Sequence, residues 1–169
     1  MKKGTVYFFT GLSGAGKTTL GGEFYRRLKS RRNDVVLLDG DQVREVYGSD
    51  FGYSTAERKK SAGYDIRLCR MLSDQGIDVV YCAISMYDEV RAWNRANIEN
   101  YKEIYVKVKM ETLYKRDQKG LYSGNVPEVV GVDLPWDEPK TPDFIVENDG
   151  QEAPGAIVDR LERQLGLRE

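Results

Sequence analysis

Five stretches of the chain are apolar, rich in β-branched or aromatic residues, and as long as a typical strand. These stretches cover residues 5–10, 34–39, 78–84, 101–108 and 143–148. The first three are almost continuously apolar, a pattern that indicates strands covered on both faces. Segments with the length of helices separate and follow them, over residues 17–32, 55–75, 87–98, 110–117 and 154–166. This alternation predicts an α/β fold, in which a parallel sheet is flanked by helices.

One long segment fits neither the strand period nor the helix period. Residues 119–142 contain four of the five prolines and three glycines. A loop of this length in a compact domain is usually a lid or a binding loop, although a surface excursion without a role is the alternative. We predict a lid at about residues 118–143, within a single domain that spans residues 1–169.

The charge balance limits the kinds of partner that the chain can have. Lys and Arg number 26 against 27 Asp and Glu, for a net charge of −1, which argues against binding to a nucleic-acid backbone. No apolar run is long enough to span a membrane, and the run at residues 5–10 is too short for a signal peptide. We therefore expect no nucleic-acid partner, no membrane partner and a cytoplasmic location.

Two residue types further restrict the chemistry. Cys69 and Cys82 are the only cysteines, too few for a disulfide framework or a zinc site, and we expect two buried free thiols. The chain has no histidine. A general base must therefore be a carboxylate, Lys, Cys or Tyr, and histidine-based triads and metal sites are excluded.

The stretch GLSGAGKT, residues 11–18, fits the pattern G-x-x-x-x-G-K-[ST] directly after a predicted strand and at the start of a predicted helix. Its glycines allow successive backbone N–H groups to face an anion, to which the helix N-terminus adds partial positive charge. In such a phosphate-binding loop, or P-loop, Lys17 would reach the β- and γ-phosphates and the Thr18 hydroxyl would bind Mg²⁺. The predicted nucleotide contacts are Gly11, Ser13, Gly14, Ala15, Gly16, Lys17, Thr18 and Thr19.

Three classes of P-loop protein are open to this chain. A GTPase would need a guanine-reading motif of the N-K-x-D kind, which the sequence lacks. A mechanical or nucleic-acid-stimulated ATPase would bring more domains or a more basic surface. A small-molecule or nucleotide kinase needs a second substrate site and a closing lid, and this class fits best.

The stretch LLDGDQVR, residues 37–44, places two carboxylates at the end of a predicted strand beside the P-loop. One carboxylate can order Mg²⁺, and the other can take the proton of an acceptor hydroxyl. We name Lys17, Asp39 and Asp41 as catalytic residues and Thr18 with Asp39 as the metal pair. Which of Asp39 and Asp41 is the base and which is the metal partner stays open. Arg44 could hold an anionic group of the acceptor. The simpler alternative is a turn followed by a helix over residues 42–47 with Asp41 as its cap.

Taken together, these motifs resemble the adenylylsulfate kinases, which use ATP and Mg²⁺ to phosphorylate the ribose 3′-hydroxyl of adenosine 5′-phosphosulfate. GLSGAGKTT matches the family's P-loop, LLDGDQVR matches L-D-G-D-x-[VIL]-R, and GYS with Glu57-Arg58 is similar to G-[FY]-S-x-x-[DE]-R. The segments at residues 83–85, 116–122 and 131–143 resemble the family's substrate-closing segment and lid. The resemblance implies a P-loop kinase with a five-stranded parallel sheet and a role in sulfate assimilation.

The resemblance also assigns residues at the acceptor site. It implies that Tyr53 packs on the substrate base, that Arg58 serves the anionic end of the substrate and that Arg116 contacts the cofactor. The implied acceptor contacts are Asp41, Arg44, Tyr53, Arg58, Ile84, Ser85, Lys119 and Val130. A homodimer is compatible with the sequence, but the sequence does not determine the oligomeric state.

The departures from the family concentrate at the acceptor site. Where the family continues x-E-N-[IL]-R-R, this chain has Ser61, Gly63 and Tyr64 in place of an asparagine and two arginines. Val129-Val130 replaces the Phe-Thr of the family's lid, which removes one face of an aromatic sandwich around the base. Adenosine 5′-phosphosulfate is the acceptor that family frequency favours. The pocket chemistry favours a relative that acts on another nucleotide, such as cytidine diphosphoramidate in capsular polysaccharide pathways. A nucleotide-binding regulatory domain without catalysis is a further alternative.

Overall fold

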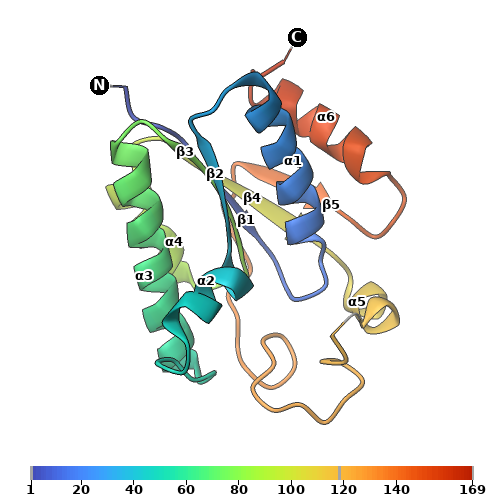
Figure 1. Ribbon diagram of the computed structural model, residues 1–169. Coiled ribbons are helices and arrows are strands. Elements are labelled where there is room, and N and C mark those ends of the chain that lie inside the picture. The colour runs from blue at the N-terminus through green and yellow to red at the C-terminus, as the bar shows by residue number, and fades with distance from the viewer. Residues whose placement is uncertain (1, 118, 169) are drawn as a thin grey trace.

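Five parallel strands form the centre of the molecule, in the order β2-β3-β1-β4-β5 (Figure 1). The computed structural model describes residues 2–117 and 119–168, so the predicted lid boundary at residue 118 lies outside the described residues. The strands are β1 Val6–Thr10, β2 Val35–Asp39, β3 Asp78–Ala83, β4 Tyr101–Lys107 and β5 Phe144–Glu147. Each strand end lies within one residue of its prediction, and the α/β fold with a parallel sheet is confirmed.

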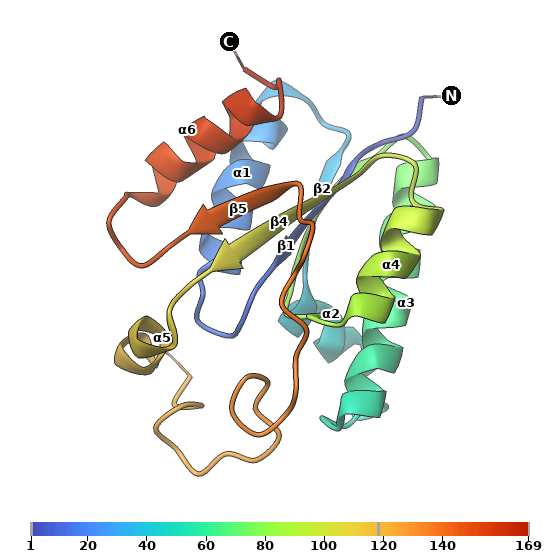
Figure 2. The ribbon, with the colours of Figure 1, turned by 180° about the vertical axis from the view of Figure 1, so that it is seen from behind.

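Helices cover both faces of this sheet. They are α1 Lys17–Arg31, α2 Gly40–Tyr47, α3 Thr55–Asp74, α4 Asp88–Asn97, α5 Met110–Arg116 and α6 Pro154–Gln164. Figures 1 and 2 show α1 and α6 on one face of the sheet and α3 and α4 on the other. Five of the helices match the predicted segments closely. The sixth, α2, corresponds to the helix that the sequence offered only as the simpler interpretation of LLDGDQVR.

The start of α2 corrects one detail of that interpretation. The helix begins at Gly40, and its N-cap is Asp39, not Asp41. The Asp39 carboxylate accepts a hydrogen bond of 2.9 Å from the backbone N–H of Asp41. Asp39 fits this role because the N-cap has extended backbone angles, which the last residue of a strand already has.

The continuous apolar character of β1 follows from its central place in the sheet. Phe8 points to the α3 side, where it stacks on Tyr81 with ring centroids 5.2 Å apart. Phe9 points to the α1 side, where it packs against Phe24 at 5.7 Å. Because both faces are buried, both alternating sets of side chains must be apolar. The two cysteines are buried and free, as predicted.

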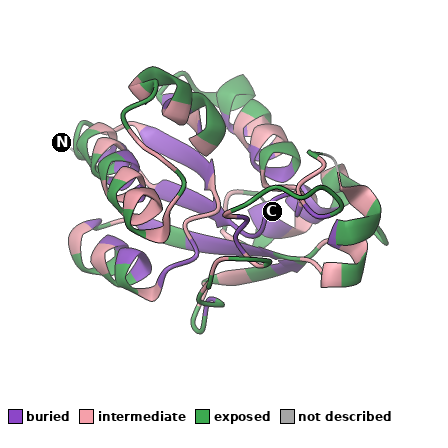
Figure 3. Cartoon of the chain, turned by 90° about the horizontal axis from the view of Figure 1, so that it is seen from below, coloured by how far each residue is buried: buried purple, intermediate pink, exposed green. Residues whose placement is uncertain are grey.

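The carboxyl ends of the strands meet at one edge of the sheet, and the P-loop, α2 and the predicted lid all lie there. Figure 3 looks at the molecule from this end and shows the buried strands between helices with exposed outer faces. The lid segment from residue 119 to 143 carries no helix or strand, only an isolated bridge between Val130 and Leu134. Its Tyr122 hydroxyl donates a hydrogen bond of 2.6 Å to the Ser13 carbonyl. The lid is therefore fastened to the P-loop. Within the described parts of the chain, no helix has the length and apolar character of a membrane span.

Candidate active site

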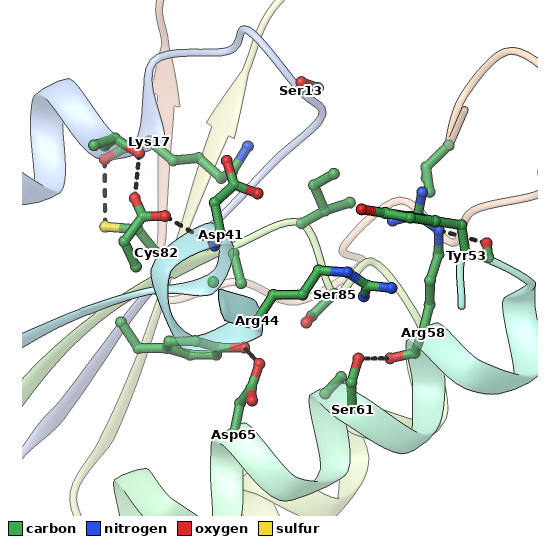
Figure 4. A pocket seen from close by; sticks show the side chains of 18 of the residues that line it. Ser13, Lys17, Asp41, Arg44, Tyr53, Arg58, Ser61, Asp65, Cys82 and Ser85 are labelled. Carbon is green, nitrogen blue, oxygen red and sulfur yellow. Dashed lines mark hydrogen bonds between the residues drawn. The ribbon is translucent and has the colours of Figure 1, made fainter. Parts of the chain in front are cut away.

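A cavity of about 720 Å³ opens at the carboxyl edge of the sheet (Figure 4). The P-loop, α2, α3, the end of β3 and the lid all contribute to its wall. The sequence-predicted residues that line it are Ser13, Gly14, Gly16, Lys17, Thr18, Thr19, Asp39, Asp41, Arg44, Tyr53, Arg58, Ile84, Ser85, Lys119 and Val130. Gly11 and Ala15 are buried in the P-loop outside this lining, and Arg116 contacts the loop from the end of α5. The structure thus brings the predicted P-loop and acceptor residues together.

The backbone of the P-loop requires glycine at two positions. Gly14 and Gly16 have φ angles of 79° and 100°, in the left-handed region where L-residues with side chains are strained. A Cβ atom on Gly16 would also lie only 2.4 Å from Nδ2 of Asn148. Gly16 is the N-cap of α1 and offers no side chain to the first N–H groups of the helix, which leaves them free to face phosphate oxygens.

Asn148, directly after β5, supports the P-loop. Its side chain donates a hydrogen bond of 2.8 Å to the Ala15 carbonyl. Arg116 donates to the Gly14 carbonyl at 3.3 Å and to the Asn148 carbonyl at 2.5 Å. The sequence analysis did not identify Asn148. Its signal was a polar residue directly after the last strand, at the edge of the sheet where sites form in α/β folds.

Lys17 lies at the junction between the P-loop and the cavity. Its Nζ atom donates a hydrogen bond of 2.8 Å to the Leu12 carbonyl. Burial lowers the pKa of Lys17 to about 8, because the charged ammonium is removed from water. Figure 4 shows its side chain and that of Asp41 directed toward the same part of the cavity.

The two carboxylates of LLDGDQVR have different surroundings. Asp39 is buried, and its second oxygen accepts a hydrogen bond of 2.6 Å from the Thr18 hydroxyl. The Asp41 side chain is 74% exposed and forms an ion pair with Lys119 from the lid. Asp39 is therefore held in place by the fold, while Asp41 is exposed at the cavity and, among the described residues, paired only with the lid residue Lys119.

The Thr18 hydroxyl and the Asp39 carboxylate fit a magnesium site. Both offer oxygen atoms, the ligands that Mg²⁺ prefers, and they lie next to the phosphate-binding loop. In the described part of the chain, no three His, Cys, Asp or Glu residues gather as a metal cluster. In nucleotide sites Mg²⁺ is usually held by one or two protein groups together with water and substrate phosphates.

At the other end of the cavity, Tyr53 is held between two arginines. Its ring is 53% exposed, with the guanidinium carbons of Arg44 and Arg58 at 4.0 Å and 5.2 Å from the ring centroid. Arg44 donates to the carbonyls of Phe51, at 2.7 Å, and of Gly52. Tyr53 is thus an exposed aromatic platform in the cavity and not a core residue.

Arg58 joins α3 to the lid across the cavity. Its guanidinium donates to the Tyr53 carbonyl at 2.8 Å and to the Glu128 carbonyl of the lid at 2.9 Å. Burial lowers the pKa of Arg58 from its usual high value. An anion bound in the cavity would compensate for this loss of solvation.

One face of α3 forms the floor of the cavity. Arg58, Ser61, Ala62 and Asp65 follow the helical spacing and all line it. Asp65 is buried and accepts hydrogen bonds of 2.8 Å from the hydroxyls of Tyr47 and Tyr81. Asp65 was not among the predicted site residues, although its position seven residues after Arg58 places it on the same face of the helix.

The segment after β3 forms the last wall of the cavity. Ser85 has a φ angle of 37°, a left-handed conformation that is rare for residues other than glycine. The Tyr87 hydroxyl is buried and has no hydrogen-bond partner, and this residue also lines the cavity. Strained backbone and unpaired buried polar groups are typical of binding sites, because a ligand can satisfy them.

The comparisons with known proteins agree with this geometry. The family model for adenylylsulphate kinase matches residues 3–147. The chain belongs to the adenylylsulfate kinase family. It is 36% identical over 166 residues to the cytidine diphosphoramidate kinase of Campylobacter jejuni, with 96% of each chain covered. It is 38% identical over 170 residues to the adenylyl-sulfate kinase of Deinococcus deserti, covering 98% of this chain and 88% of the other.

A solved adenylylsulfate kinase has nearly the same fold. The structure of the Mycobacterium tuberculosis APS kinase in complex with AMPPNP and APS matches with a TM-score of 0.89 and 28% identity, over 98% of this chain and 99% of that one. The bound AMPPNP is an analogue of ATP, which supports ATP binding in this family. As a member, the chain is an ATP-dependent phosphotransferase with a P-loop kinase fold, and the family predicted from the sequence is confirmed.

Proposed function

We propose that this adenylylsulfate kinase family member transfers the γ-phosphoryl group of ATP to the ribose 3′-hydroxyl of a nucleotide. The observation that carries the proposal is the position of Asp41. Its exposed carboxylate lies in the cavity two residues after Asp39, whose own carboxylate is bonded to Thr18 of the P-loop. An exposed carboxylate beside a phosphate-binding loop is suited to receive the proton of an acceptor hydroxyl.

Each group beside the P-loop has a distinct task in this proposal. Thr18 and Asp39 would hold Mg²⁺, which when bound neutralises charge on the phosphates. The Lys17 ammonium pairs with phosphate oxygens, and the backbone N–H groups after Gly14 orient them. These contacts hold the γ-phosphoryl group beside the acceptor hydroxyl and counter its charge.

The transfer itself needs one base. The 3′-oxygen forms a bond to the γ-phosphorus as the bond from that phosphorus to the β,γ-bridging oxygen breaks, and ADP leaves. The hydroxyl proton passes to Asp41. The chain has no histidine, so a carboxylate is the natural acceptor for this proton. Lys119, which pairs with Asp41 in the structure, is placed to move to an incoming phosphate.

Adenosine 5′-phosphosulfate is the first candidate acceptor. The family to which the chain belongs favours it, as does the presence of the aromatic platform at Tyr53 and of Arg44 and Arg58 beside it. Two arginines match the two anionic groups of a phosphosulfate. This acceptor would place the enzyme in sulfate assimilation. The cytoplasmic location and the homodimer stay predictions.

Cytidine diphosphoramidate is the second candidate, and a specific observation favours it. Val129-Val130 replaces the Phe-Thr of the family's lid, and of this pair Val130 lines the cavity with an aliphatic side chain, so no aromatic ring from these two positions covers the base. A smaller pyrimidine needs less stacking area than adenine, and a relative that acts on this nucleotide matches the chain from end to end. This acceptor would place the enzyme in capsular polysaccharide modification.

A coupled ADP-release assay tests the proposal. Purified protein with ATP and Mg²⁺ is given adenosine 5′-phosphosulfate, cytidine diphosphoramidate, CDP, AMP and CMP in turn, and phosphorus NMR locates the new phosphate. We expect one acceptor to dominate and the phosphate to appear on the 3′-oxygen. Turnover no faster than ATP hydrolysis without an acceptor would refute the assignment as a nucleotide kinase.

A further inference from the structure

The floor of the cavity, on α3, is the wall that the 5′-end of a bound acceptor nucleotide would face. In the proposed function, which this inference rests on, the ribose lies near Asp41 and the base lies on Tyr53. The 5′-substituent then extends into the remaining space, toward the face of α3. In the view of Figure 4, Arg44 and Ser85 lie between Tyr53 and Asp65, around this space. Arg44 and Arg58 can hold the anionic oxygens of the 5′-substituent. Asp65 lies on the floor of the same cavity, where the end of the substituent would reach.

Asp65 is a hydrogen-bond acceptor with unused capacity. An ionised carboxylate accepts about four hydrogen bonds and donates none. The hydroxyls of Tyr47 and Tyr81 supply two, one to each carboxylate oxygen, at 2.8 Å. Among the described residues, no Lys or Arg lies within ion-pair distance of Asp65, although its side chain is buried. The remaining lone pairs therefore require donors, and the cavity is where donors can come from.

Ser61, the neighbouring residue on the floor of the cavity, is also a hydrogen-bond acceptor toward the cavity. Ser61 lies four residues before Asp65 on the same face of α3 and also lines the cavity. Here the Ser61 hydroxyl donates to the Arg58 carbonyl at 3.1 Å, so its oxygen can only accept from a ligand. The floor thus offers hydrogen-bond acceptors at both Ser61 and Asp65.

The Tyr87 hydroxyl is another polar group on a residue that lines the cavity, and it has no partner among the described residues. Tyr87 is 4% exposed and lines the same cavity, yet its hydroxyl has no partner in the structure. Leaving a buried hydroxyl unpaired is costly, and a ligand oxygen or N–H group would remove that cost. The wall of the cavity thus includes Tyr87 as well as Asp65 among the residues with unused hydrogen-bonding capacity.

We infer that Asp65 is a specificity residue that selects acceptors whose terminal 5′-group carries N–H donors, as a phosphoramidate does, over acceptors that end in a sulfate. The two terminal groups have nearly the same size and the same single negative charge. They differ because a sulfate presents only acceptor oxygens, while the phosphoramidate nitrogen has two hydrogens. A sulfate oxygen against the Asp65 carboxylate would pair acceptor with acceptor, and a phosphoramidate would satisfy both groups.

Two acceptors with the same base isolate this effect. They are adenosine 5′-phosphosulfate and adenosine diphosphoramidate, and kcat/KM is measured for each with ATP and Mg²⁺. We expect the wild-type enzyme to prefer the phosphoramidate by about tenfold or more, since sites with buried polar groups reject analogues that leave them unpaired. In Asp65→Asn, whose amide can donate to a sulfate, the ratio of the two kcat/KM values should fall to about one or reverse.

The controls separate selectivity from a loss of fold. Asp74→Asn, at the far end of the same helix, should leave the ratio unchanged. A wild-type ratio near one, or an Asp65→Asn ratio equal to that of the wild type, would overturn the inference while the kinase assignment stands. If Asp65→Asn does not fold, the wild-type ratio alone decides. No turnover with any nucleotide would overturn the proposed function and this inference together.

Discussion

The Thr18 hydroxyl donates a hydrogen bond of 2.6 Å to Oδ2 of Asp39, and this contact ties the first turn of α1 to the end of β2. The other oxygen of Asp39 caps α2 through the Asp41 N–H. One buried carboxylate thus fixes two elements of the nucleotide site. Asp41 has no such structural bond from its side chain to the sheet, so the two carboxylates should respond differently to the same substitution.

Asp41→Asn should abolish transfer and spare ATP binding. The amide keeps the shape of the side chain but cannot take a proton, and loss of a general base costs about 10²- to 10⁴-fold in rate. We expect kcat for the preferred nucleotide to fall by that factor, while the Kd for ATP, measured by calorimetry, changes little. Wild-type turnover in this variant would remove Asp41 from the mechanism.

Asp39→Asn is the matched comparison. Asparagine is a good N-cap, so the free energy of unfolding should change by less than about 1 kcal/mol. The affinity for ATP measured with Mg²⁺ should fall, because the metal loses its anionic oxygen. If Asp39→Asn instead keeps its ATP affinity and Asp41→Asn loses it, the roles of the two residues are exchanged.

Binding of ATP should take up a proton near pH 8. Burial lowers the pKa of Lys17 from 10.5 to about 8, so its charged form is disfavoured in the free folded protein. Between about pH 8 and pH 10.5, Lys17 is still protonated in the unfolded chain but has lost its proton in the folded chain. The contribution of Lys17 to the free energy of unfolding therefore increases as the pH rises through this range. Phosphates beside Lys17 favour the ammonium again, so the Kd for ATP should rise above pH 8.

Calorimetry in two buffers with different ionisation enthalpies measures this uptake. At pH 7 it should be small, and at pH 8.5 it should be a substantial fraction of one proton per nucleotide. In Lys17→Arg the guanidinium stays charged at both values, and the uptake should disappear. Equal uptake in the two proteins would assign the proton to another group.

The periodicity of the sequence predicted the elements and the P-loop motif predicted the nucleotide end of the site, because both are local patterns. Continuous apolar runs report strands buried on both faces, and G-x-x-x-x-G-K-[ST] needs only its own backbone and the next helix. Gly14, Lys17 and Thr18 therefore lie where the sequence places them. The end of β2 was also predictable, since parallel strands finish at the same edge of the sheet.

The acceptor end was harder to predict because its groups come from distant parts of the chain. The surroundings of Asp65 depend on Tyr47 and Tyr81, which approach it from other elements, and Asn148 meets the P-loop because the order of the strands brings the end of β5 close to it. A polar residue in a helix is ordinarily solvated. The predicted N-cap of α2 was wrong by two residues. Asp39 and Asp41 have the same side chain, and only the position at which β2 ends decides which of them caps the helix.

Asn148 and Gly16 should be energetically coupled. Asn148→Ala removes the hydrogen bond to the Ala15 carbonyl and should lower the free energy of unfolding by about 1–2 kcal/mol. Gly16→Ala meets two obstacles, a φ angle of 100° and a contact of 2.4 Å with Nδ2 of Asn148. When Asn148 is already alanine, the new Cβ at position 16 no longer meets Nδ2. The added cost of Gly16→Ala should then be only its backbone strain, about 1–2 kcal/mol.

Urea denaturation of the four proteins measures this coupling. The cost of the double variant should be smaller than the sum of the two single costs by at least about 0.5 kcal/mol, the level at which neighbouring residues depart from additivity. Additive costs would mean that the Asn148 side chain moves aside freely. In that case its bond to the P-loop contributes little.

Tyr53 should contribute to acceptor binding and almost nothing to folding. The ring is 53% exposed, and an exposed substitution usually changes the free energy of unfolding by no more than about 0.5 kcal/mol. Stacking of a base on an aromatic ring contributes about 1–3 kcal/mol, so Tyr53→Ala should raise the KM for the acceptor by about 5- to 150-fold, with the KM for ATP unchanged. Tyr53→Phe keeps the ring and should behave like the wild type. A rise in the KM for ATP equal to that for the acceptor would instead mean that Tyr53 acts by positioning Arg44 and Arg58, whose guanidinium groups it holds at 4.0 Å and 5.2 Å.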